Sequence, residues 1–284
     1  MKPSDASGWR TLAVCADDFG LAPGVSSAIA RLARAQRISA ISCITNTPPW
    51  VSDAGLLANL PRSVDVGLHV NLTEGRPLSR RLAALWPTLP GLSELILRAH
   101  LRQLPLAELR IEVHRQLIAF RDATGSDPAH VDGHQHVHHL PGLRSIILDM
   151  AEQLHPRAAV RSTALLPGPG FGRKRWLIRH TGATALATEL DKRGLLHNPM
   201  LLGVHDFRTS HYRLLMQRWI ARIPAGGALL FCHPGSGDAS VAADPIAQAR
   251  ARELAYFESD AWPQDLAQAQ VQPGRVWQLA PTTP

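Results

Sequence analysis

Short apolar runs alternate with segments of helical spacing along most of the chain. Residues 12–16 and 227–232 are nearly continuous apolar runs, which is typical of strands that are buried on both faces of a sheet. Residues 106–120 instead carry apolar side chains at the spacing of one helix face, as in an amphipathic helix. The predicted strands span 12–16, 38–45, 64–72, 129–132, 158–162, 200–207, 227–232 and 276–279, and the predicted helices span 24–36, 52–60, 106–120, 143–154, 175–190, 212–222 and 244–259. This alternation predicts an α/β fold with a parallel sheet.

The residues best suited to chemistry follow the predicted strands. Asp17-Asp18 comes after the first strand, His69 lies towards the end of the third, a histidine cluster follows 129–132, and His233 follows 227–232. The active site of a (β/α) barrel lies at the carboxyl ends of its strands, so this pattern favours a TIM-barrel-like (β/α) barrel. A doubly wound sheet would also place ligands at strand ends, but it usually carries a glycine-rich phosphate loop, and the chain contains neither GxGxxG nor GxxxxGK[ST].

No repeat or clear linker divides the sequence. We therefore expect a single barrel domain over residues 12–284, preceded by a short flexible lead-in over residues 1–11. Residues 73–91 are rich in Pro, Gly and Arg and predict a long loop, and long loops in compact domains often cover a site. Whether residues 73–104 form a mobile lid stays open.

The histidine cluster lies in Val131-Asp132-Gly133-His134-Gln135-His136-Val137-His138-His139-Leu140-Pro141. His134 and His138 are four residues apart, a spacing that returns to the same face in both a helix and a strand. Neutral imidazole is the commonest metal ligand in proteins, so the cluster predicts a metal site. A His-rich surface loop is the alternative.

Two adjacent carboxylates at the end of a buried strand are costly unless they are paired or bind a cation. A turn or helix cap is the alternative for Asp17 and Asp18. One carboxylate and two imidazoles can hold a divalent ion and leave positions open for water and substrate. The second carboxylate could then act as general base, and an imidazole such as His233 could protonate a leaving amine. These parts suit hydrolysis of an amide or an ester.

Composition narrows the class of protein. The 284 residues are 45% hydrophobic and 19% charged, as in soluble globular proteins. The net charge is +7, but the basic residues are dispersed and aromatic residues are few, which argues against nucleic-acid binding. No apolar run approaches a membrane span, and the polar N-terminus lacks the apolar core of a secretory signal. Three widely separated cysteines predict free thiols in a reducing compartment, and therefore a cytoplasmic protein.

Four motifs occur in order along the chain: Ala16-Asp17-Asp18-Phe19-Gly20-Leu21, Val66-Gly67-Leu68-His69, Asp132-Gly133-His134-Gln135-His136-Val137-His138 and Cys232-His233-Pro234-Gly235. In this order they resemble the motifs of the YdjC-like carbohydrate deacetylases, which include chitooligosaccharide deacetylases and hopanoid-biosynthesis-associated deacetylases. The resemblance implies a TIM-barrel-like fold and metal-dependent removal of acetyl groups from N-acetylated sugars. The hopanoid branch often has Lys and Phe where this chain has Gln135 and Val137, which favours the general sugar-deacetylase activity.

The resemblance also implies roles for single residues: the metal ligands would be Asp18, His69 and His134, the catalytic base Asp17, the general acid His233, and the substrate-binding residues His138 and Arg161. A surface salt bridge is the alternative for Arg161. The resemblance implies Mg²⁺ as the cofactor, whereas an Asp/His/His set suits Zn²⁺ because magnesium prefers oxygen ligands. We therefore expect one divalent cation and leave its identity open.

The expected partner is a small-molecule or oligosaccharide substrate, with no nucleic acid and no membrane span, and self-association into a homo-oligomer stays open. Two other functions remain in view. One is a different metallohydrolase on the same fold, acting on a non-sugar amide, an ester or a phosphodiester. The other is a non-catalytic sugar- or polyanion-binding protein, against which the intact acid pair of Asp17 and Asp18 counts.

Overall fold

The computed structural model describes residues 8–236 and 244–277. Within these ranges eight strands form one sheet in the order β5-β4-β3-β2-β1-β7-β6, with β8 beside the start of β1. The strands are β1 (Arg10–Phe19), β2 (Ala40–Cys43), β3 (Asp65–Val70), β4 (His130–Gly133), β5 (Ala159–Val160), β6 (Leu201–Leu202), β7 (Ala228–Cys232) and β8 (Val271–Pro273). All of their pairings are parallel, which confirms the predicted α/β fold.

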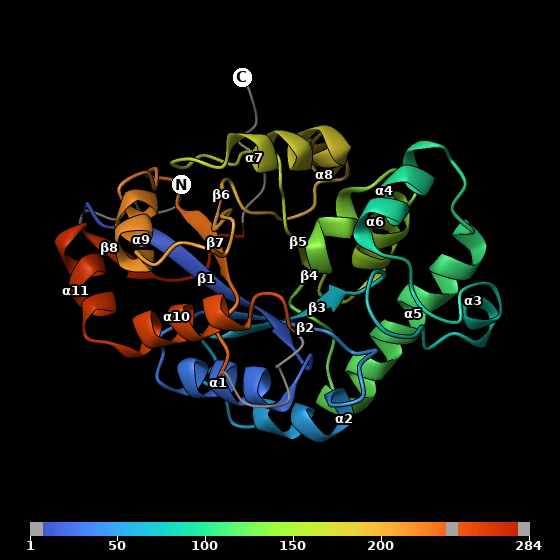
Figure 1. Cartoon of the computed structure of the whole chain (residues 1–284), viewed down its shortest axis with the longest axis horizontal. Coiled ribbons are helices and arrows are strands. Elements are labelled where there is room, and N and C mark those ends of the chain that lie inside the picture. Colours follow the sequence, from blue (N-terminus) through green and yellow to red (C-terminus); the bar gives the residue numbers. More distant parts are fainter. Residues whose placement is uncertain (1–7, 237–243, 278–284) are drawn as a thin grey trace.

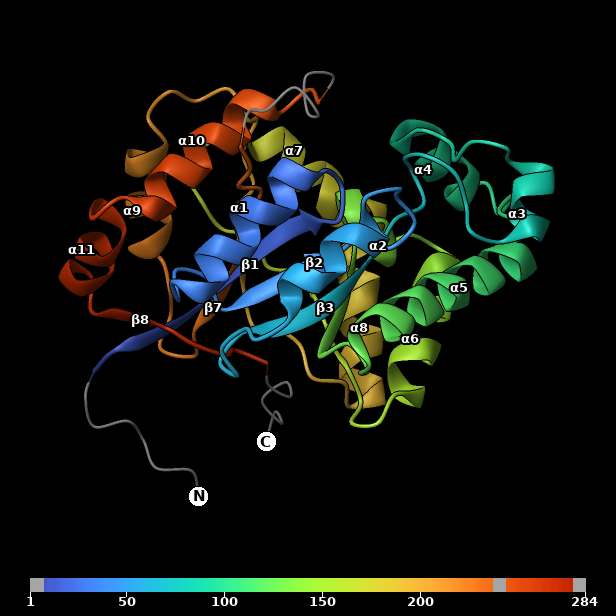
Figure 2. The ribbon, with the colours of Figure 1, turned by 90° about the horizontal axis from the view of Figure 1, so that it is seen from below.

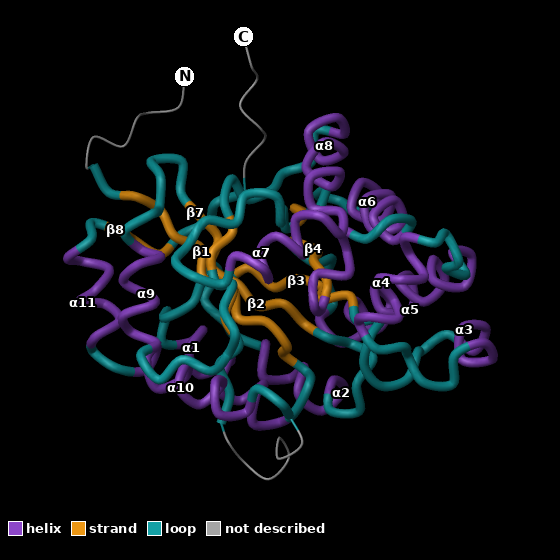
Figure 3. The backbone as a smooth tube through the Cα atoms, turned by 45° about the horizontal axis from the view of Figure 1, so that its top comes forward, coloured by secondary structure: helices purple, strands orange, loops and turns teal. Residues whose placement is uncertain are grey.

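Helices surround these strands, which run through the middle of the molecule (Figure 1; Figure 3). The helices are α1 (Pro23–Arg34), α2 (Trp50–Asp53), α3 (Arg80–Leu85), α4 (Leu92–His100), α5 (Leu106–Thr124), α6 (Leu143–Gln153), α7 (Gly172–Ile178), α8 (Thr184–Arg193), α9 (Tyr212–Ile220), α10 (Ala247–Glu258) and α11 (Ala261–Gln268). Figure 2 shows α1, α2 and α5 along the outer side of β1, β2 and β3. No helix in the described ranges is long and apolar enough to cross a membrane.

The strands form a half-barrel that is open between β5 and β6. Each of these two strands has only two residues, and they pair with β4 and β7 rather than with each other. Within the described part of the chain, one isolated bridge pairs Val160 of β5 with His197, in the segment before β6. The structure is therefore TIM-barrel-like in the order and direction of its strands, but it is an open barrel.

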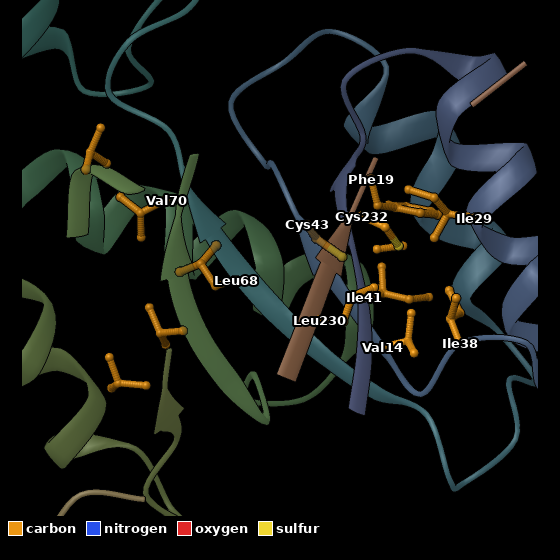
Figure 4. Close-up of a cluster of buried hydrophobic side chains, with 14 of the residues drawn as sticks. Val14, Phe19, Ile29, Ile38, Ile41, Cys43, Leu68, Val70, Leu230 and Cys232 are labelled. Carbon is orange, nitrogen blue, oxygen red and sulfur yellow. The ribbon is translucent and has the colours of Figure 1, made fainter. Parts of the chain in front are cut away.

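Side chains of β1 alternate between two environments. Leu12, Val14 and Ala16 belong to the main apolar core, whereas Ala13 and Cys15 face the inside of the half-barrel and belong to a smaller cluster. Figure 4 shows Val14 and other strand residues close to Ile29 of α1. Because successive side chains of a strand point to opposite faces, Ala13, Cys15 and Asp17 reach the interior, where the candidate site lies.

Several local expectations need correction. The predicted loop over 73–91 contains α3. The predicted helix over 175–190 is divided by a π-helical turn, Arg179–Ala183, in which Gly182 has φ +147° and lies so close to the carbonyl oxygen of His139 that a Cβ would be 2.0 Å from it. The last strand is β8 rather than 276–279, of which 276 and 277 are irregular and 278–279 lie outside the described residues.

The predicted lead-in also ends earlier than expected. Residues 10 and 11 already belong to β1, where they pair with the start of β8. Residues 1–7 lie outside the described residues. The first strand is consequently longer than its apolar run, because it includes flanking polar residues at both ends.

Candidate active site

The end of β1 turns both members of the acid pair into the half-barrel. Strict alternation would point Asp17 inward and Asp18 outward. Asp18 has φ +71°, however, and the pairing register of β1 with β2 shifts between Ala16 and Phe19. This irregularity behaves like a bulge that re-aims a side chain, and Asp is among the residues that tolerate a left-handed backbone. Both carboxylates are therefore buried and both line the same cavity.

Strands β3 and β4 place their polar residues on the same interior face. His69 pairs in register with Asp132, and Nδ1 of His69 lies 2.6 Å from Oδ1 of Asp132. Gly67, two residues earlier, has no side chain, and its Cα faces the ring of His130 so closely that a Cβ would be 2.4 Å away. The glycine in the Val66-Gly67-Leu68-His69 motif thus makes room for the buried ring of His130.

Asp18, His69 and His134 form a group whose ligand atoms all lie within 4.8 Å of one another. Oδ1 of Asp18 is 2.9 Å from Nδ1 of His134 and 3.5 Å from Nε2 of His69. All three side chains are buried and line the cavity. One carboxylate oxygen and two imidazole nitrogens are a donor set that fits zinc and other transition ions.

The electrostatics of this group favour a cation. Burial lowers the pKa of His69, but the charges of Asp132 and Asp17, together with hydrogen bonds to carboxylates, outweigh burial and raise the pKa to about 10. Burial also lowers the pKa of His134, but the charge and hydrogen bond of Asp18 raise it to about 9. Both imidazoles therefore hold protons at pH 7 when no ion is bound. A divalent cation would take the place of that positive charge.

Asp17 is held by Arg161. The guanidinium donates to both oxygens of Asp17, at 2.6 Å and 2.7 Å, and also pairs with Asp132. Arg161 is fully buried and lies 3.2 Å from the sulfur of Cys15. Two other groups of potential metal ligands, Cys15 with His130 and Asp132, and Asp17 with His69 and Asp132, adjoin this guanidinium. Arg161 pairs with a carboxylate in each of these two groups. Arg250 contacts Asp18 through Oδ2 and leaves Oδ1 towards His69 and His134, so among the described residues the group around Asp18 is the best fit for a metal ion.

The structure does not place Arg161 or His138 on the cavity wall. Both are fully buried, and Nε2 of His138 donates to the backbone oxygen of Arg161 at 2.9 Å. Burial lowers the pKa of His138 to about 4, so the ring is neutral. Of the two residues expected to contact substrate, Arg161 instead holds the carboxylate of Asp17, and His138 is bonded to the backbone of Arg161. The surface salt bridge considered for Arg161 is likewise replaced by a buried one.

His233 follows β7 and lines the cavity. Its ring lies between Phe207 and Phe231, with centroids 5.2 Å and 5.6 Å away, and its backbone N–H donates to Oε2 of Glu253 at 2.6 Å. Burial lowers the pKa of His233 to about 3, so the ring is neutral at pH 7. Five of the residues that the sequence placed at strand ends therefore line one cavity: Asp17, Asp18, His69, His134 and His233.

Arg250 was not found from the sequence. It lies on α10, is 2% exposed, and donates to Oδ2 of Asp18 at 2.7 Å, while Asp244 pairs with its Nε atom. Burial raises the pKa of Asp18, but Arg250 and His134 outweigh burial and hold that pKa well below its usual range. Arg250 therefore keeps Asp18 ionised and leaves its Oδ1 atom directed at the two histidines.

A signal for Arg250 exists in the helix pattern. Arg250 and Glu253 share the buried face of α10 with Leu254 and Phe257. Charged residues on the apolar face of an amphipathic helix must find buried partners. Glu74, whose Oε1 lies 3.2 Å from Nε2 of His134, had no comparable signal, because it lies in the loop after β3, where an exposed carboxylate is ordinary.

The cavity that these residues share has a volume of about 650 Å³. Both charged or polar side chains and apolar side chains line it. The other lining residues are Leu21, Ala22, Glu74, Leu92, Gly133, Gln135, His136, Lys174, Leu177, Ile178, Phe207, Phe231, Asp244, Pro245, Ile246 and Arg250. Volumes of this size accommodate a substrate of about the size of a drug molecule.

The sequence is similar to those of known proteins over most of its length. A family model described as YdjC-like protein matches residues 11–268. A carbohydrate deacetylase from Mus musculus is 33% identical over 246 residues, which cover 79% of this chain and 77% of the mouse protein. A chitooligosaccharide deacetylase from Proteus mirabilis (strain HI4320) is 34% identical over 149 residues, which cover 50% of this chain and 55% of that protein.

Among solved structures, a protein from Enterococcus faecalis V583 superposes with a TM-score of 0.71. The match covers 95% of this chain and 98% of that protein, at 17% sequence identity. That protein bears the provisional name of a cellobiose-phosphate cleavage protein. At this level of identity the likeness concerns the fold alone.

Proposed function

The chain belongs to the YdjC-like protein family, and on that premise we propose that it is a metal-dependent carbohydrate deacetylase that hydrolyses the acetamido group of N-acetylated sugars. The observation that carries the proposal is the group of Asp18, His69 and His134 beside the separately held carboxylate of Asp17. The names of the mouse and Proteus mirabilis relatives support the choice of substrate class.

In this proposal Asp18, His69 and His134 hold one divalent cation. When bound, the ion supplies Lewis-acid polarisation of the acyl carbonyl and of the attacking water. Arg250 and Asp132 fix two of the three ligands from outside, since Arg250 donates to Asp18 at 2.7 Å and Asp132 contacts His69 at 2.6 Å. The mixed oxygen and nitrogen donors favour zinc or another transition ion over magnesium.

Asp17 is the general base of the proposal. Its two oxygens accept hydrogen bonds from Arg161, so the carboxylate cannot rotate away from the cavity. It takes a proton from water as the water oxygen bonds to the acyl carbon. Neutral His233, on the cavity wall, passes a proton to the amine nitrogen as the C–N bond breaks. Since the pKa of His233 is about 3, the ring is neutral before the reaction. It receives the proton that Asp17 took from water and passes it on to the amine, so Asp17 is again ionised and His233 again neutral when the products leave.

A substrate panel tests the proposed substrate class. We expect kcat/KM for acetate release from N,N'-diacetylchitobiose to exceed the values for an N-acetyl amino-acid amide and for p-nitrophenyl acetate. The expected difference is at least about tenfold, the effect of one lost hydrogen bond of about 1.4 kcal/mol. Bis(p-nitrophenyl) phosphate should not react. Preference for the ester or the phosphodiester would replace the sugar-deacetylase proposal with that of another metallohydrolase.

A further inference from the structure

We infer that Glu74 is a positioning residue for His134, the counterpart of Asp132 for His69, so that each candidate histidine ligand is oriented by its own carboxylate. The inference rests on the proposed metal-dependent function, since it concerns how the ligands of that ion are held. It assigns a role to a residue of the cavity rim that none of the four motif segments contains.

His69 shows the arrangement in its complete form. Nδ1 lies 2.6 Å from Oδ1 of Asp132, and Nε2 lies 3.5 Å from Oδ1 of Asp18. The ring thus has one nitrogen on a buried carboxylate and the other towards the group that fits a metal. Such a carboxylate–histidine pair fixes the tautomer and the ring plane of a metal ligand.

His134 has the same arrangement with the nitrogens exchanged. Nδ1 lies 2.9 Å from Oδ1 of Asp18, so this is the nitrogen that faces the proposed ion. Nε2 is buried and has no aligned hydrogen-bond partner among the described residues, but Oε1 of Glu74 lies 3.2 Å from it, at ion-pair distance. A small rotation of the Glu74 side chain would complete the hydrogen bond.

The backbone around Glu74 is fixed in advance. Oδ1 of Asn71 accepts from the N–H groups of Thr73 and Glu74, both at 3.1 Å, and its Nδ2 donates to the carbonyl of Glu74 at 2.9 Å. Asn71 is itself fully buried, and its backbone is held at both polar groups by the side chain of Gln116. This loop is therefore built to present residue 74 at one position.

A second contact ties Glu74 to the histidine segment. Nε2 of Gln135 donates to Oε1 of Glu74 at 3.1 Å. Gln135 and His136 both have positive φ, 53° and 63°, a conformation that costs energy for residues other than glycine. This sharp turn immediately follows His134, and the contact with Glu74 connects its first residue to the loop after β3.

The exposure of the two carboxylates differs, and this sets the expected size of the effect. Asp132 is fully buried, whereas 46% of the Glu74 side chain is exposed. Loss of an outer partner of a metal ligand typically weakens metal affinity about 10–100-fold. Because solvent screens an exposed charge, we expect Glu74 to lie near the lower end of that range.

Titration of the metal-stripped full-length protein with Co²⁺, followed by the visible absorption of the bound ion, tests this role without measuring activity. The variant Glu74→Ala should bind Co²⁺ about tenfold more weakly and with an altered absorption spectrum. The variant Glu74→Gln retains a neutral acceptor and should fall between Glu74→Ala and the wild type. The variant Glu94→Gln, an exposed carboxylate on α4, is the matched control and should titrate like the wild type.

An unchanged dissociation constant and spectrum in Glu74→Ala, with normal binding by the wild type, would overturn the role of Glu74 and leave the proposed function intact. Absence of Co²⁺ binding by the wild type would overturn both. Melting curves of the variants, monitored by circular dichroism, separate a local effect from lost folding. If Glu74→Ala does not fold, the Glu74→Gln titration decides, and an affinity equal to that of the wild type would count against the role.

Discussion

The variant Asp18→Asn is expected to lose tight metal binding and acetate release together. Oδ1 of Asp18 is the only anionic donor in the group that it forms with His69 and His134. Replacing it with an amide removes the charge that balances a divalent ion and keeps the side-chain shape. We expect metal affinity to fall by more than the roughly 10–100-fold that loss of an outer partner costs.

Metal content after dialysis and acetate release from N,N'-diacetylchitobiose check this result on the same samples. Asp122→Asn is a suitable control, because Asp122 is exposed on α5. Arg250 loses its partner at Asp18 but keeps Asp244, so melting curves should accompany the assay. Full turnover by Asp18→Asn, with normal metal content, would show that the ion is held elsewhere.

The variant Asp17→Asn is expected to separate catalysis from metal binding. Asp17 accepts both hydrogen bonds from Arg161 and is absent from the group around Asp18. Loss of a general base typically lowers the rate about 10²–10⁴-fold. We therefore expect kcat to fall by that factor while metal affinity stays within a few-fold of the wild type.

Steady-state kinetics and the same metal titration distinguish the outcomes for Asp17→Asn. Arg161 is fully buried and still pairs with Asp132 in this variant, so the fold should persist with a lower melting temperature. An unchanged kcat would exclude Asp17 as the base. Equal losses of kcat and metal affinity would instead indicate that Asp17 belongs to the metal site.

The sequence predicted the residues of the site that belong to strand ends. Asp17-Asp18, His69, His134 and His233 follow apolar runs, and parallel strands deliver their carboxyl ends to one edge, so the shared cavity follows from topology. The inward direction of Asp18 did not follow from alternation. It depends on the positive φ of that residue and on the register shift between Ala16 and Phe19.

Charge pairs between distant segments could not be predicted. Arg250 and Asp18 are separated by 232 positions, and Arg161 and Asp17 by 144. A single sequence gives no measure of which buried cation meets which carboxylate. The resemblance therefore placed Arg161 on the substrate side, whereas the structure buries it behind Asp17.

The fold was predictable to a similar depth. The alternation of strands and helices predicted a parallel sheet. It did not predict that β5 and β6 would have only two residues each and that the barrel would be open between them. Apolar patterning does not reveal such short pairings. The π-helical turn within 175–190 likewise depends on the close contact of Gly182 with His139, which is a tertiary effect.

Acetate release from N,N'-diacetylchitobiose before and after chelation tests the central claim, that Asp18, His69 and His134 hold a catalytic ion. Activity should disappear on removal of metal and return when zinc, cobalt, manganese or magnesium is added back. The metal that restores the highest activity is the preferred ion. Activity that survives complete removal of metal would contradict the claim. So would the absence of acetate release with every metal, from protein shown to bind one.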